Sequence, residues 1–314
     1  MSSIALLFPG QGAQAVGMGK DLAEASPAAQ AVFEMADAEL GIALSRLCWD
    51  GPPEELSRSD MAQPAILTAS VAALHALREA AGDLPPVAAG AGLSLGEYSA
   101  LVAAGALAFR QAVKLVRARG QFMQDACEEN PGTMYSILGM DDESVEQACA
   151  DAGEGVWPAN YNCPGQLVIS GRKSAAARAA RLCEERGARR AIQLKVAGAF
   201  HTPLMQSAAD RLAPELERTD FAEPEFPVVA NVTARPVREP DEIRRLLVEQ
   251  VVSPVRWADG MRRVISQGVD EFYEVGPGTV LQGLLRRIDR DQACRSVSDP
   301  EQVRSIASDW QKGD

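Results

Sequence analysis

The 314-residue chain has only two histidines, 5% aromatic residues and no surplus of positive charge. Its 31 Lys and Arg residues face 43 Asp and Glu, a formal net charge of −12. This balance argues against nucleic acid as a partner, because binding to a phosphate backbone needs a surplus of basic residues. The longest apolar run, around Ala100 to Phe109, is shorter than the ~20 residues of a membrane span. We expect no signal peptide at the start of the chain, and the sequence therefore predicts a soluble, cytoplasmic protein without a membrane partner.

Cysteine pairs of the C-x-x-C type are also lacking. The six cysteines are scattered along the chain at Cys48, Cys127, Cys149, Cys163, Cys183 and Cys294. This spacing favours buried free thiols in a reducing cytosol over a disulfide framework or a metal site. We expect no metal centre.

Short apolar segments alternate with helical patterns over most of the chain. The clearest strands are Ile4–Phe8, Val87–Gly92 and Glu271–Val275, and the clearest helices are Pro27–Leu40, Pro64–Ala81 and Phe109–Glu128. Such alternation predicts an α/β fold with a parallel sheet covered by helices on both faces. The tail after Arg290 is polar, and we expect it to be only loosely attached.

The middle of the chain has a different pattern. Four strands and two helices follow one another in the order Met134–Leu138, Asp141–Ala152, Val156–Asn160, Gln166–Ser170, Lys173–Arg186 and Arg189–Val196. This β-α-β-β-α-β order is that of a ferredoxin-like unit. We therefore predict a small ferredoxin-like subdomain at residues 129–196, inserted into a large α/β domain formed by residues 1–128 and 197–314.

The pentapeptide Gly92-Leu93-Ser94-Leu95-Gly96 stands between a predicted strand and a predicted helix. In that context G-x-S-x-G forms a nucleophile elbow, which exposes the serine hydroxyl at a helix N-terminus with its free N–H groups. The pentapeptide alone is a weak signal, and a structural glycine turn is the alternative. The strand–turn–helix context favours Ser94 as a catalytic nucleophile.

Only two histidines can supply the base that such a serine needs. His75 lies in the middle of a predicted helix, where a packed or surface histidine is the simpler interpretation. His201 lies in a turn just before a helix, where a side chain can point into a cleft, so it is the better general base. More than a hundred residues follow His201, whereas the histidine of α/β-hydrolases lies near the C-terminus. A different serine fold is therefore expected.

At this point the motifs resemble one family, the malonyl-CoA:acyl carrier protein transacylases of fatty-acid and polyketide synthesis. The resemblance runs from Phe8 to about Ile288. The motifs, in the order of the family, are Phe8-Pro9-Gly10-Gln11-Gly12, Gln63-Pro64-Ala65, Gly92-Leu93-Ser94-Leu95-Gly96-Glu97, Arg119 before Gly120-Gln121, Asn160-Tyr161-Asn162, Phe200-His201-Thr202, Gln250 before Ser253-Pro254-Val255-Arg256-Trp257, and Glu274-Val275-Gly276-Pro277-Gly278.

The resemblance implies an α/β-hydrolase-like large domain with a central parallel sheet, and a ping-pong transfer. Ser94 attacks malonyl-CoA while His201 takes the proton, and the thiol of acyl carrier protein then removes the malonyl group. The backbone N–H groups of Gln11 and Leu95 are implied as the oxyanion hole. A main-chain carbonyl near Gln250 is implied to orient the histidine, in place of a triad acid.

The resemblance also implies further pocket residues, which are Gln63, Asn160, Gln166 and Phe200. It implies no permanently bound cofactor, malonyl-CoA as substrate, acyl carrier protein as partner and a monomer. Two residues depart from the family: Leu93 stands where His often precedes the nucleophile, and Thr202 where Ser is common. We do not expect Leu93 to remove activity, because the base lies elsewhere.

Arg119 stands out on the helix predicted at 109–128. Ala112, Val116, Arg119 and Met123 form one stripe, so Arg119 lies on the buried face, where an unpaired charge is costly. A salt bridge to an internal Asp or Glu is the structural alternative. By the resemblance, Arg119 matches the arginine that holds malonate's free carboxylate, as a planar guanidinium can do with two hydrogen bonds. Phe200 resembles the malonyl-selective form of the family.

Basic residues gather locally in the small subdomain despite the negative total. From Gly171 to Lys195 there are eight, against Glu184 and Glu185 only: Arg172, Lys173, Arg178, Arg181, Arg186, Arg189, Arg190 and Lys195. Such a face can attract an acidic carrier protein, although an ordinary solvated helix explains any single residue equally well. We call this set the basic segment.

Three other functions are compatible with parts of the pattern. An editing acyl hydrolase of the same fold would keep Ser94 and His201 but would not need Arg119. A trans-acting polyketide acyltransferase would share all three residues, and the sequence leaves fatty-acid and polyketide synthesis open. A non-enzymatic docking subunit is disfavoured by the intact set of motifs.

Overall fold

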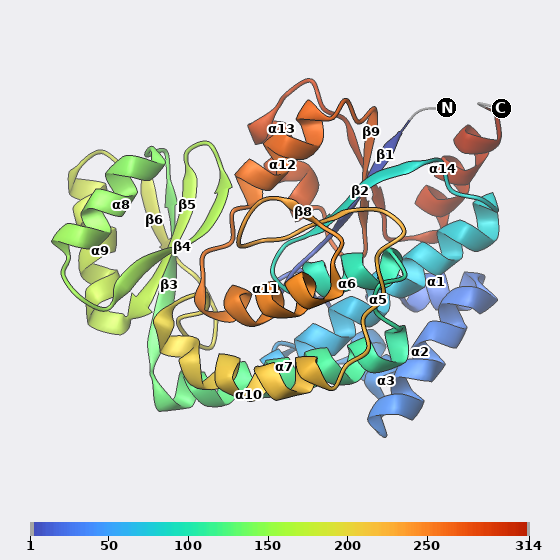
Figure 1. Cartoon of the computed structure of the whole chain (residues 1–314), viewed down its shortest axis with the longest axis horizontal. Helices are drawn as coiled ribbons and strands as arrows, with labels where there is room; N and C mark the ends of the chain where they lie inside the picture. The colour runs from blue at the N-terminus through green and yellow to red at the C-terminus, as the bar shows by residue number, and fades with distance from the viewer. Residues whose placement is uncertain (1–2, 313–314) are drawn as a thin grey trace.

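The structure is a computed structural model that describes residues 3–312 and contains two separate β-sheets (Figure 1). The larger sheet has the strand order β10-β9-β1-β2-β7-β8. Its strands are β1 Ile4–Phe8, β2 Val87–Gly92, β7 Val228–Val229, β8 Pro236–Val237, β9 Glu271–Val275 and β10 Cys294–Val297. All neighbours in it are parallel except β7 and β8. The predicted α/β fold with a central parallel sheet is confirmed.

Helices cover both faces of this sheet, as the unbroken apolar run of β1 requires. Ile4, Leu6 and Phe8 point into one core, while Ala5 and Leu7 point into another, because side chains alternate along a strand. The first core is shared with α1 Lys20–Ala25, α2 Pro27–Leu40, α3 Leu44–Asp50, α5 Ser59–Ala81, α6 Gly96–Ala103 and α7 Phe109–Glu129. The second core is closed by α12 Trp257–Ser266 and α13 Val280–Ile288.

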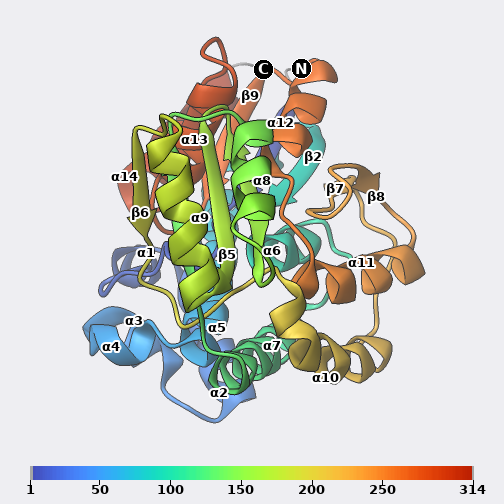
Figure 2. The ribbon, with the colours of Figure 1, turned by 90° about the vertical axis from the view of Figure 1, so that its left-hand side faces the viewer.

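The smaller sheet is antiparallel, with the order β4-β5-β3-β6. Its strands are β3 Gly132–Leu138, β4 Val156–Cys163, β5 Gln166–Arg172 and β6 Arg190–Gln193, and α8 Asp142–Asp151 and α9 Lys173–Glu185 cover one face (Figure 2). Numbered along the chain, this strand order is 2-3-1-4, which is the ferredoxin-like arrangement predicted from the sequence. The limits of the two domains, at residues 128/129 and 196/197, stay a prediction.

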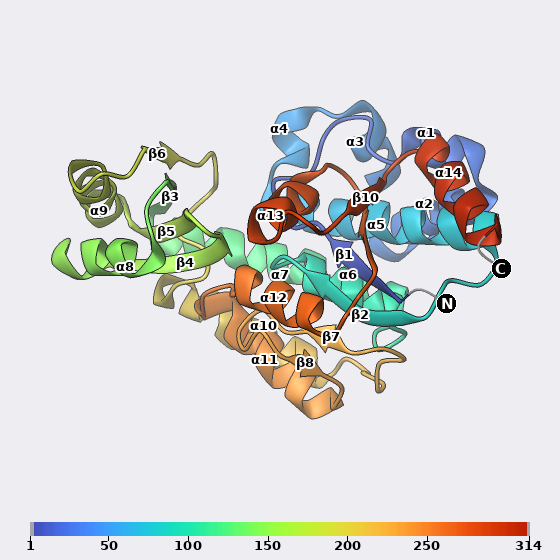
Figure 3. The ribbon, with the colours of Figure 1, turned by 90° about the horizontal axis from the view of Figure 1, so that it is seen from above.

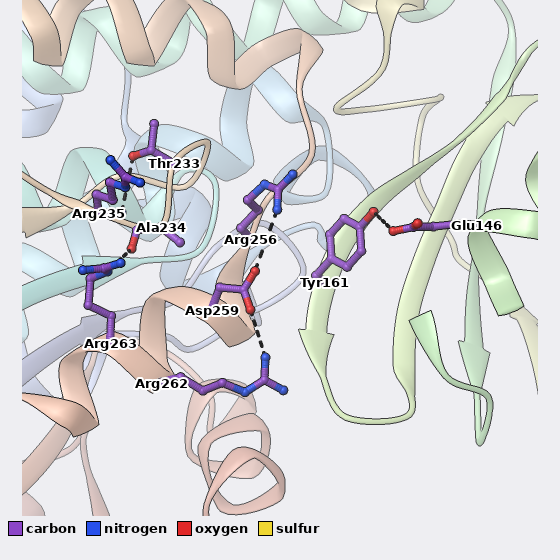
Figure 4. A network of polar contacts seen from close by, with 9 residues as sticks. All are labelled: Glu146, Tyr161, Thr233, Ala234, Arg235, Arg256, Asp259, Arg262 and Arg263. Carbon is purple, nitrogen blue, oxygen red and sulfur yellow. Dashed lines mark hydrogen bonds and ion pairs between the residues drawn. The ribbon is translucent and has the colours of Figure 1, made fainter. Parts of the chain in front are cut away.

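The two sheets lie side by side, with the small one at one end of the molecule (Figure 3). Main-chain hydrogen bonds tie the small sheet to the segment that precedes α12 in the large domain: Tyr161 N donates to Val255 O over 2.9 Å, and Val255 N donates to Ala159 O over 2.8 Å. Beside this joint, the Tyr161 hydroxyl donates to Glu146 over 2.6 Å and the Arg256 guanidinium lies 5.8 Å from the Tyr161 ring centre (Figure 4). The joint holds the segment that follows α11 Pro240–Val252.

Two expectations about helices were wrong. The tail after Arg290 is not loose: β10 extends the sheet, and α14 Pro300–Lys312 packs against α5 through Val303 and Ile306. The helix expected at Pro64–Ala81 begins at Ser59, so Pro64 lies inside it. The remaining elements are α4 Pro53–Leu56, the 3-10 turn Pro203–Met205 and α10 Gln206–Glu217.

All six cysteines are buried free thiols, as the sequence predicts. Within residues 3–312, no helix combines the length and apolar character that crossing a membrane requires.

Candidate active site

Ser94 occupies a sharp turn between the end of β2 and the start of α6. Its φ of +53° lies in the left-handed region, which a serine rarely adopts and which marks strain at a functional turn. The glycines on either side make the turn possible. A Cβ on Gly92 would lie 1.9 Å from the carbonyl carbon of Gly96, and one on Gly96 would lie 2.1 Å from Phe8 O. The turn is therefore a nucleophile elbow in its geometry.

His201 meets this serine from the segment just before the 3-10 turn. Its Nε2 lies 2.9 Å from Ser94 Oγ, and its Nδ1 lies 2.8 Å from the main-chain oxygen of Gln250. Because a carbonyl only accepts, Nδ1 carries the proton and Nε2 is free to accept the hydroxyl proton of Ser94. Burial, and next the charge of Arg119, lower the pKa of His201 to about 4. His201 is therefore neutral at pH 7, in the form that a general base needs.

The Arg119 side chain extends from α7 to the Ser94 hydroxyl, and Arg119 is only 1% exposed. Its Nη1 donates to Gln63 Oε1 over 2.7 Å, and its Nη2 donates to Gln250 Oε1 over 2.9 Å and to Ser94 Oγ over 3.2 Å. Its Nε is buried and has no hydrogen-bond partner within residues 3–312. The stripe predicted for this helix is confirmed, since Ala112, Val116 and Met123 are buried with it.

The structural alternative for Arg119, a salt bridge, is not what holds this side chain. Its three hydrogen-bond partners are two amides and a hydroxyl, all neutral, and no carboxylate of residues 3–312 comes within 4.0 Å of it. Burying a guanidinium without a carboxylate on it is unfavourable. Arg119 thus presents a positive charge beside the serine hydroxyl, where an anionic group of a substrate would bind.

Two residues that sequence reasoning missed complete the cluster. Glu97 Oε2 accepts from Gln250 Nε2 over 2.7 Å and from Asn231 N over 2.9 Å. The Asn231 side chain in turn donates to Gly92 O over 2.7 Å and accepts from Ser94 N over 2.6 Å. Glu97 and Asn231 therefore hold the elbow in place through hydrogen bonds. Glu97 stood inside a quoted motif, whereas nothing around Asn231 in the sequence points to the site.

Of the predicted oxyanion donors, Leu95 caps the N-terminus of α6 and Gln11 follows β1. Neither main-chain N–H donates to a protein acceptor within the part of the chain that the structure describes. The Gln11 side chain donates to Ser59 Oγ over 3.2 Å. Both N–H groups thus remain available, as an oxyanion hole requires.

The other predicted pocket residues lie at different distances from the cluster. Gln63 is fully buried and bonded to Arg119, and Phe200 is buried directly before His201. Asn160, on β4, pairs with Val255 at the joint between the small sheet and the segment before α12. Gln166 lies at the start of β5, where it accepts from Arg287 over 2.7 Å. The structure brings Gln63 and Phe200 to the cluster, but no hydrogen bond links Asn160 or Gln166 to Ser94, His201 or Arg119.

His75 is exposed on α5, and no hydrogen bond links it to this cluster, in agreement with its interpretation as a packed or surface histidine. Among residues 3–312, no group of three or more His, Cys, Asp and Glu side chains could hold a metal ion. The site combines a serine, a neutral histidine and a fixed cation, and this arrangement can carry out nucleophilic acyl transfer.

Comparison with known proteins identifies the family. Residues 5–313 match the sequence profile of the acyl transferase domain. The chain belongs to the acyl transferase domain family.

Curated relatives include the malonyl CoA-acyl carrier protein transacylase of Bacillus subtilis, 47% identical over 306 residues with 96% of each chain covered. That of Escherichia coli K12 is 45% identical over 302 residues, covering 96% of this chain and 97% of its own.

Solved structures agree with this membership. A type II polyketide acyl-carrier protein in complex with its malonyl-transacylase includes a chain with a TM-score of 0.95 and 43% identity, covering 98% of this chain and all of that one. An acyl carrier protein S-malonyltransferase from Vibrio cholerae gives a TM-score of 0.93 at 45% identity, covering 96% and 99%.

Proposed function

We propose that this chain transfers a malonyl group from malonyl-CoA to the phosphopantetheine thiol of an acyl carrier protein through a malonyl-Ser94 intermediate. The names of its relatives support the substrates. The observation that carries the specificity is the buried guanidinium of Arg119, whose Nη2 lies 3.2 Å from Ser94 Oγ. Malonyl differs from acetyl by a carboxylate, and this cation lies beside the atom to which the acyl group is attached.

In the first half-reaction, Ser94 Oγ attacks the thioester carbonyl carbon while His201 Nε2 takes the hydroxyl proton. The tetrahedral oxyanion forms next to the N–H groups of Gln11 and Leu95, which lower its energy by hydrogen bonding. The carbon–sulfur bond then breaks, and His201 returns the proton to the CoA sulfur. Malonyl-Ser94 and CoA result.

In the second half-reaction, His201 takes the proton of the carrier protein's thiol, and the sulfur attacks the ester carbonyl of malonyl-Ser94. The bond to Ser94 Oγ breaks, and His201 returns the proton to that oxygen. The hydrogen bond from His201 Nδ1 to Gln250 O supports this role, because it keeps Nε2 directed at the serine in both halves.

The acidic carrier protein docks, in this proposal, on the basic segment of the small sheet, and the enzyme acts as a monomer in the cytoplasm. All eight basic residues of the segment are exposed. Arg186 is paired with Asp151, and Arg178 donates to Ala152 O, so these two are less available than the other six. Six buried free thiols are in keeping with a reducing compartment.

The decisive experiment is mass spectrometry of the intact protein after brief exposure to malonyl-CoA. We expect one malonyl adduct on the wild type, its removal on adding holo acyl carrier protein with formation of malonyl carrier protein, and no adduct on Ser94→Ala. Absence of an adduct on the folded wild type would contradict the proposal. An adduct that water removes equally fast with and without carrier protein would instead indicate an acyl hydrolase.

A further inference from the structure

Glu97 is a buried carboxylate that the mechanism above does not use. It lies in the first turn of α6, three residues after the nucleophile, and is 2% exposed. No Lys, Arg or His nitrogen of residues 3–312 lies within 4.0 Å of it. A buried carboxylate without a direct ion pair is costly and therefore needs an explanation.

We infer that Glu97 is a positioning residue whose ionised carboxylate balances Arg119 through Gln250 in the free enzyme and takes up a proton when a malonyl carboxylate binds Arg119. The inference rests on the proposed function. In the free enzyme the negative charge of Glu97 balances Arg119, and in the acyl-enzyme the malonyl carboxylate takes over this role.

Gln250 connects the two charges. Its Oε1 accepts from Arg119 Nη2 over 2.9 Å, and its Nε2 donates to Glu97 Oε2 over 2.7 Å and to Ser94 O over 3.1 Å. Because a guanidinium only donates and a carboxylate only accepts, only one orientation of the amide satisfies both neighbours. The same residue supplies the carbonyl that orients His201. The pair Glu97 and Arg119 therefore holds in place the residue that positions the base.

Asn231 connects Glu97 to the nucleophile through a second set of hydrogen bonds. Glu97 Oε2 fixes the main-chain N–H of Asn231, whose side chain spans Gly92 O and Ser94 N on the two sides of the elbow. Gln250 and Asn231 both donate to the same carboxylate oxygen of Glu97. A change at Glu97 should therefore alter the positions of Ser94 and His201 together.

The charges around Glu97 explain the proton uptake. Arg119 of α7 is the charged group that acts on Glu97, Tyr98 is its titratable neighbour on α6, and His201 lies beyond Gln250. Burial raises the pKa of Glu97 to about 7 even with Arg119 nearby. A second carboxylate on Arg119 adds a like charge and weakens the stabilisation by the guanidinium, and both effects raise that pKa further. Near neutral pH, malonylation should therefore protonate Glu97, whereas acetylation should not.

The natural test variant is Glu97→Gln, because both donors to Glu97 converge on Oε2. A glutamine oxygen at that position can accept both hydrogen bonds, so the variant removes the charge and leaves the geometry. A matched control is Glu274→Gln, which neutralises another fully buried glutamate. Glu274 accepts from Leu281 N and Gln282 N at the start of α13 and bonds to neither Gln250 nor Asn231.

The experiment measures protons taken up per acyl-enzyme formed, with a pH indicator in weakly buffered solution at pH 7.5 and without carrier protein. Acetyl-CoA serves as the reference, since it releases the same CoA thiol. Starting from a pKa of about 7, the wild type should take up at most about three quarters of a proton more with malonyl than with acetyl. Glu274→Gln should match the wild type, and Glu97→Gln should show no difference between the two acyl groups. The kcat of Glu97→Gln should fall by about tenfold, which corresponds to ~1.4 kcal/mol at the barrier.

Equal uptake by Glu97→Gln and the wild type, or none by a wild type that does form malonyl-Ser94, would overturn the inference. A wild type that forms no acyl-enzyme would contradict the proposed function instead. If Glu97→Gln does not fold, Glu97→Asp keeps the carboxylate on a shorter side chain. It should retain the uptake with a reduced kcat, and loss of the uptake in that folded variant would also count against the inference.

Discussion

At the scale of one residue, the proposed function assigns the selection of the acyl group to the buried cation of Arg119. We predict that Arg119→Ala loses malonyl transfer by about 100-fold, because a desolvated hydrogen-bonded charge pair contributes several kcal/mol. The variant should accept acetyl or longer acyl groups at least as well as the wild type. Rates of acyl-enzyme formation with malonyl-CoA and acetyl-CoA measure both effects.

A suitable control for that variant is Arg117→Ala. Arg117 is a half-buried arginine on the same helix, and it donates to Leu40 O rather than to the site. An unchanged preference for malonyl over acetyl in Arg119→Ala would show that the guanidinium does not recognise the malonyl carboxylate.

Glu97 and His201 also predict an unusual pH dependence of stability. The pKa of His201 falls on folding to about 4, so its contribution to stability is lost as the pH drops from about 6.5 through 4. The pKa of Glu97 rises on folding to about 7, so its contribution is lost as the pH rises from about 4.5 through 7. Between pH 4.5 and 6.5 the two effects have opposite signs and nearly cancel, because folding in effect moves one proton from His201 to Glu97.

A variant that keeps only one of the two groups should show how that group alone makes the free energy of unfolding depend on pH. In urea unfolding, the stability of Glu97→Gln relative to the wild type should rise with pH between 4.5 and 6.5 by ~1.4 kcal/mol per pH unit. His201→Gln should show the opposite slope of similar size. Parallel pH profiles of the wild type and both variants would show that neither group changes its protonation on folding.

The residues of the site differ in how far the sequence could predict them. Ser94 belongs to a local pattern, His201 is one of two histidines, and Arg119 breaks an apolar stripe, so each has a signal within about one helix length. Glu97 stands in a quoted motif that does not indicate its role, and nothing around Asn231 points to the site, because the roles of both residues arise from contacts across 153 and 137 positions of the chain. The contact between Asn231 and Ser94 exists only after the parallel sheet brings β2 and β7 together.

At the scale of elements, α14 carries a prediction that the sequence interpretation missed. Ile306 is 1% exposed and packs into the core that α14 shares with α5. We predict that Ile306→Ala lowers the free energy of unfolding by about 3 kcal/mol, as for other fully buried aliphatic side chains. Because α14 supplies no residue of the site, kcat per folded molecule should stay the same.

The exposed Arg304 on the same helix provides the control, and Arg304→Ala should change the stability by less than about 0.5 kcal/mol. If Ile306→Ala were equally mild, α14 would be as loosely attached as its polar composition suggests. Composition misled here because Val303, Ile306, Ala307 and Trp310 recur at helical spacing, and periodicity is the stronger signal. The start of α5 was predicted at Pro64 because proline is common in the first turn of a helix. The helix in fact starts five residues earlier.

At the scale of the whole molecule, the proposed function requires a chain of charge −12 to meet an acidic carrier protein. The basic segment runs from the end of β5 through α9 to just beyond β6, which forms one edge of the small sheet. Charged residues on an edge strand also prevent pairing with other chains, so their presence alone does not identify a docking surface. Reversing the charge distinguishes the two roles, because a glutamate protects an edge as well as an arginine does but repels an acidic partner.

We predict that the double variant Arg189→Glu/Arg190→Glu raises the KM for carrier protein about tenfold at low salt, with a smaller effect as ionic strength screens the charges. Formation of malonyl-Ser94 from malonyl-CoA alone should not change. The control is Arg46→Glu/Arg304→Glu, which makes the same change in net charge at two exposed positions on α3 and α14, both in the large domain and away from the small sheet (Figure 3). If that control raises the KM equally, total charge rather than a local surface governs the encounter. If both half-reactions of the Arg189/Arg190 variant slow together, the basic segment serves the fold and not the partner.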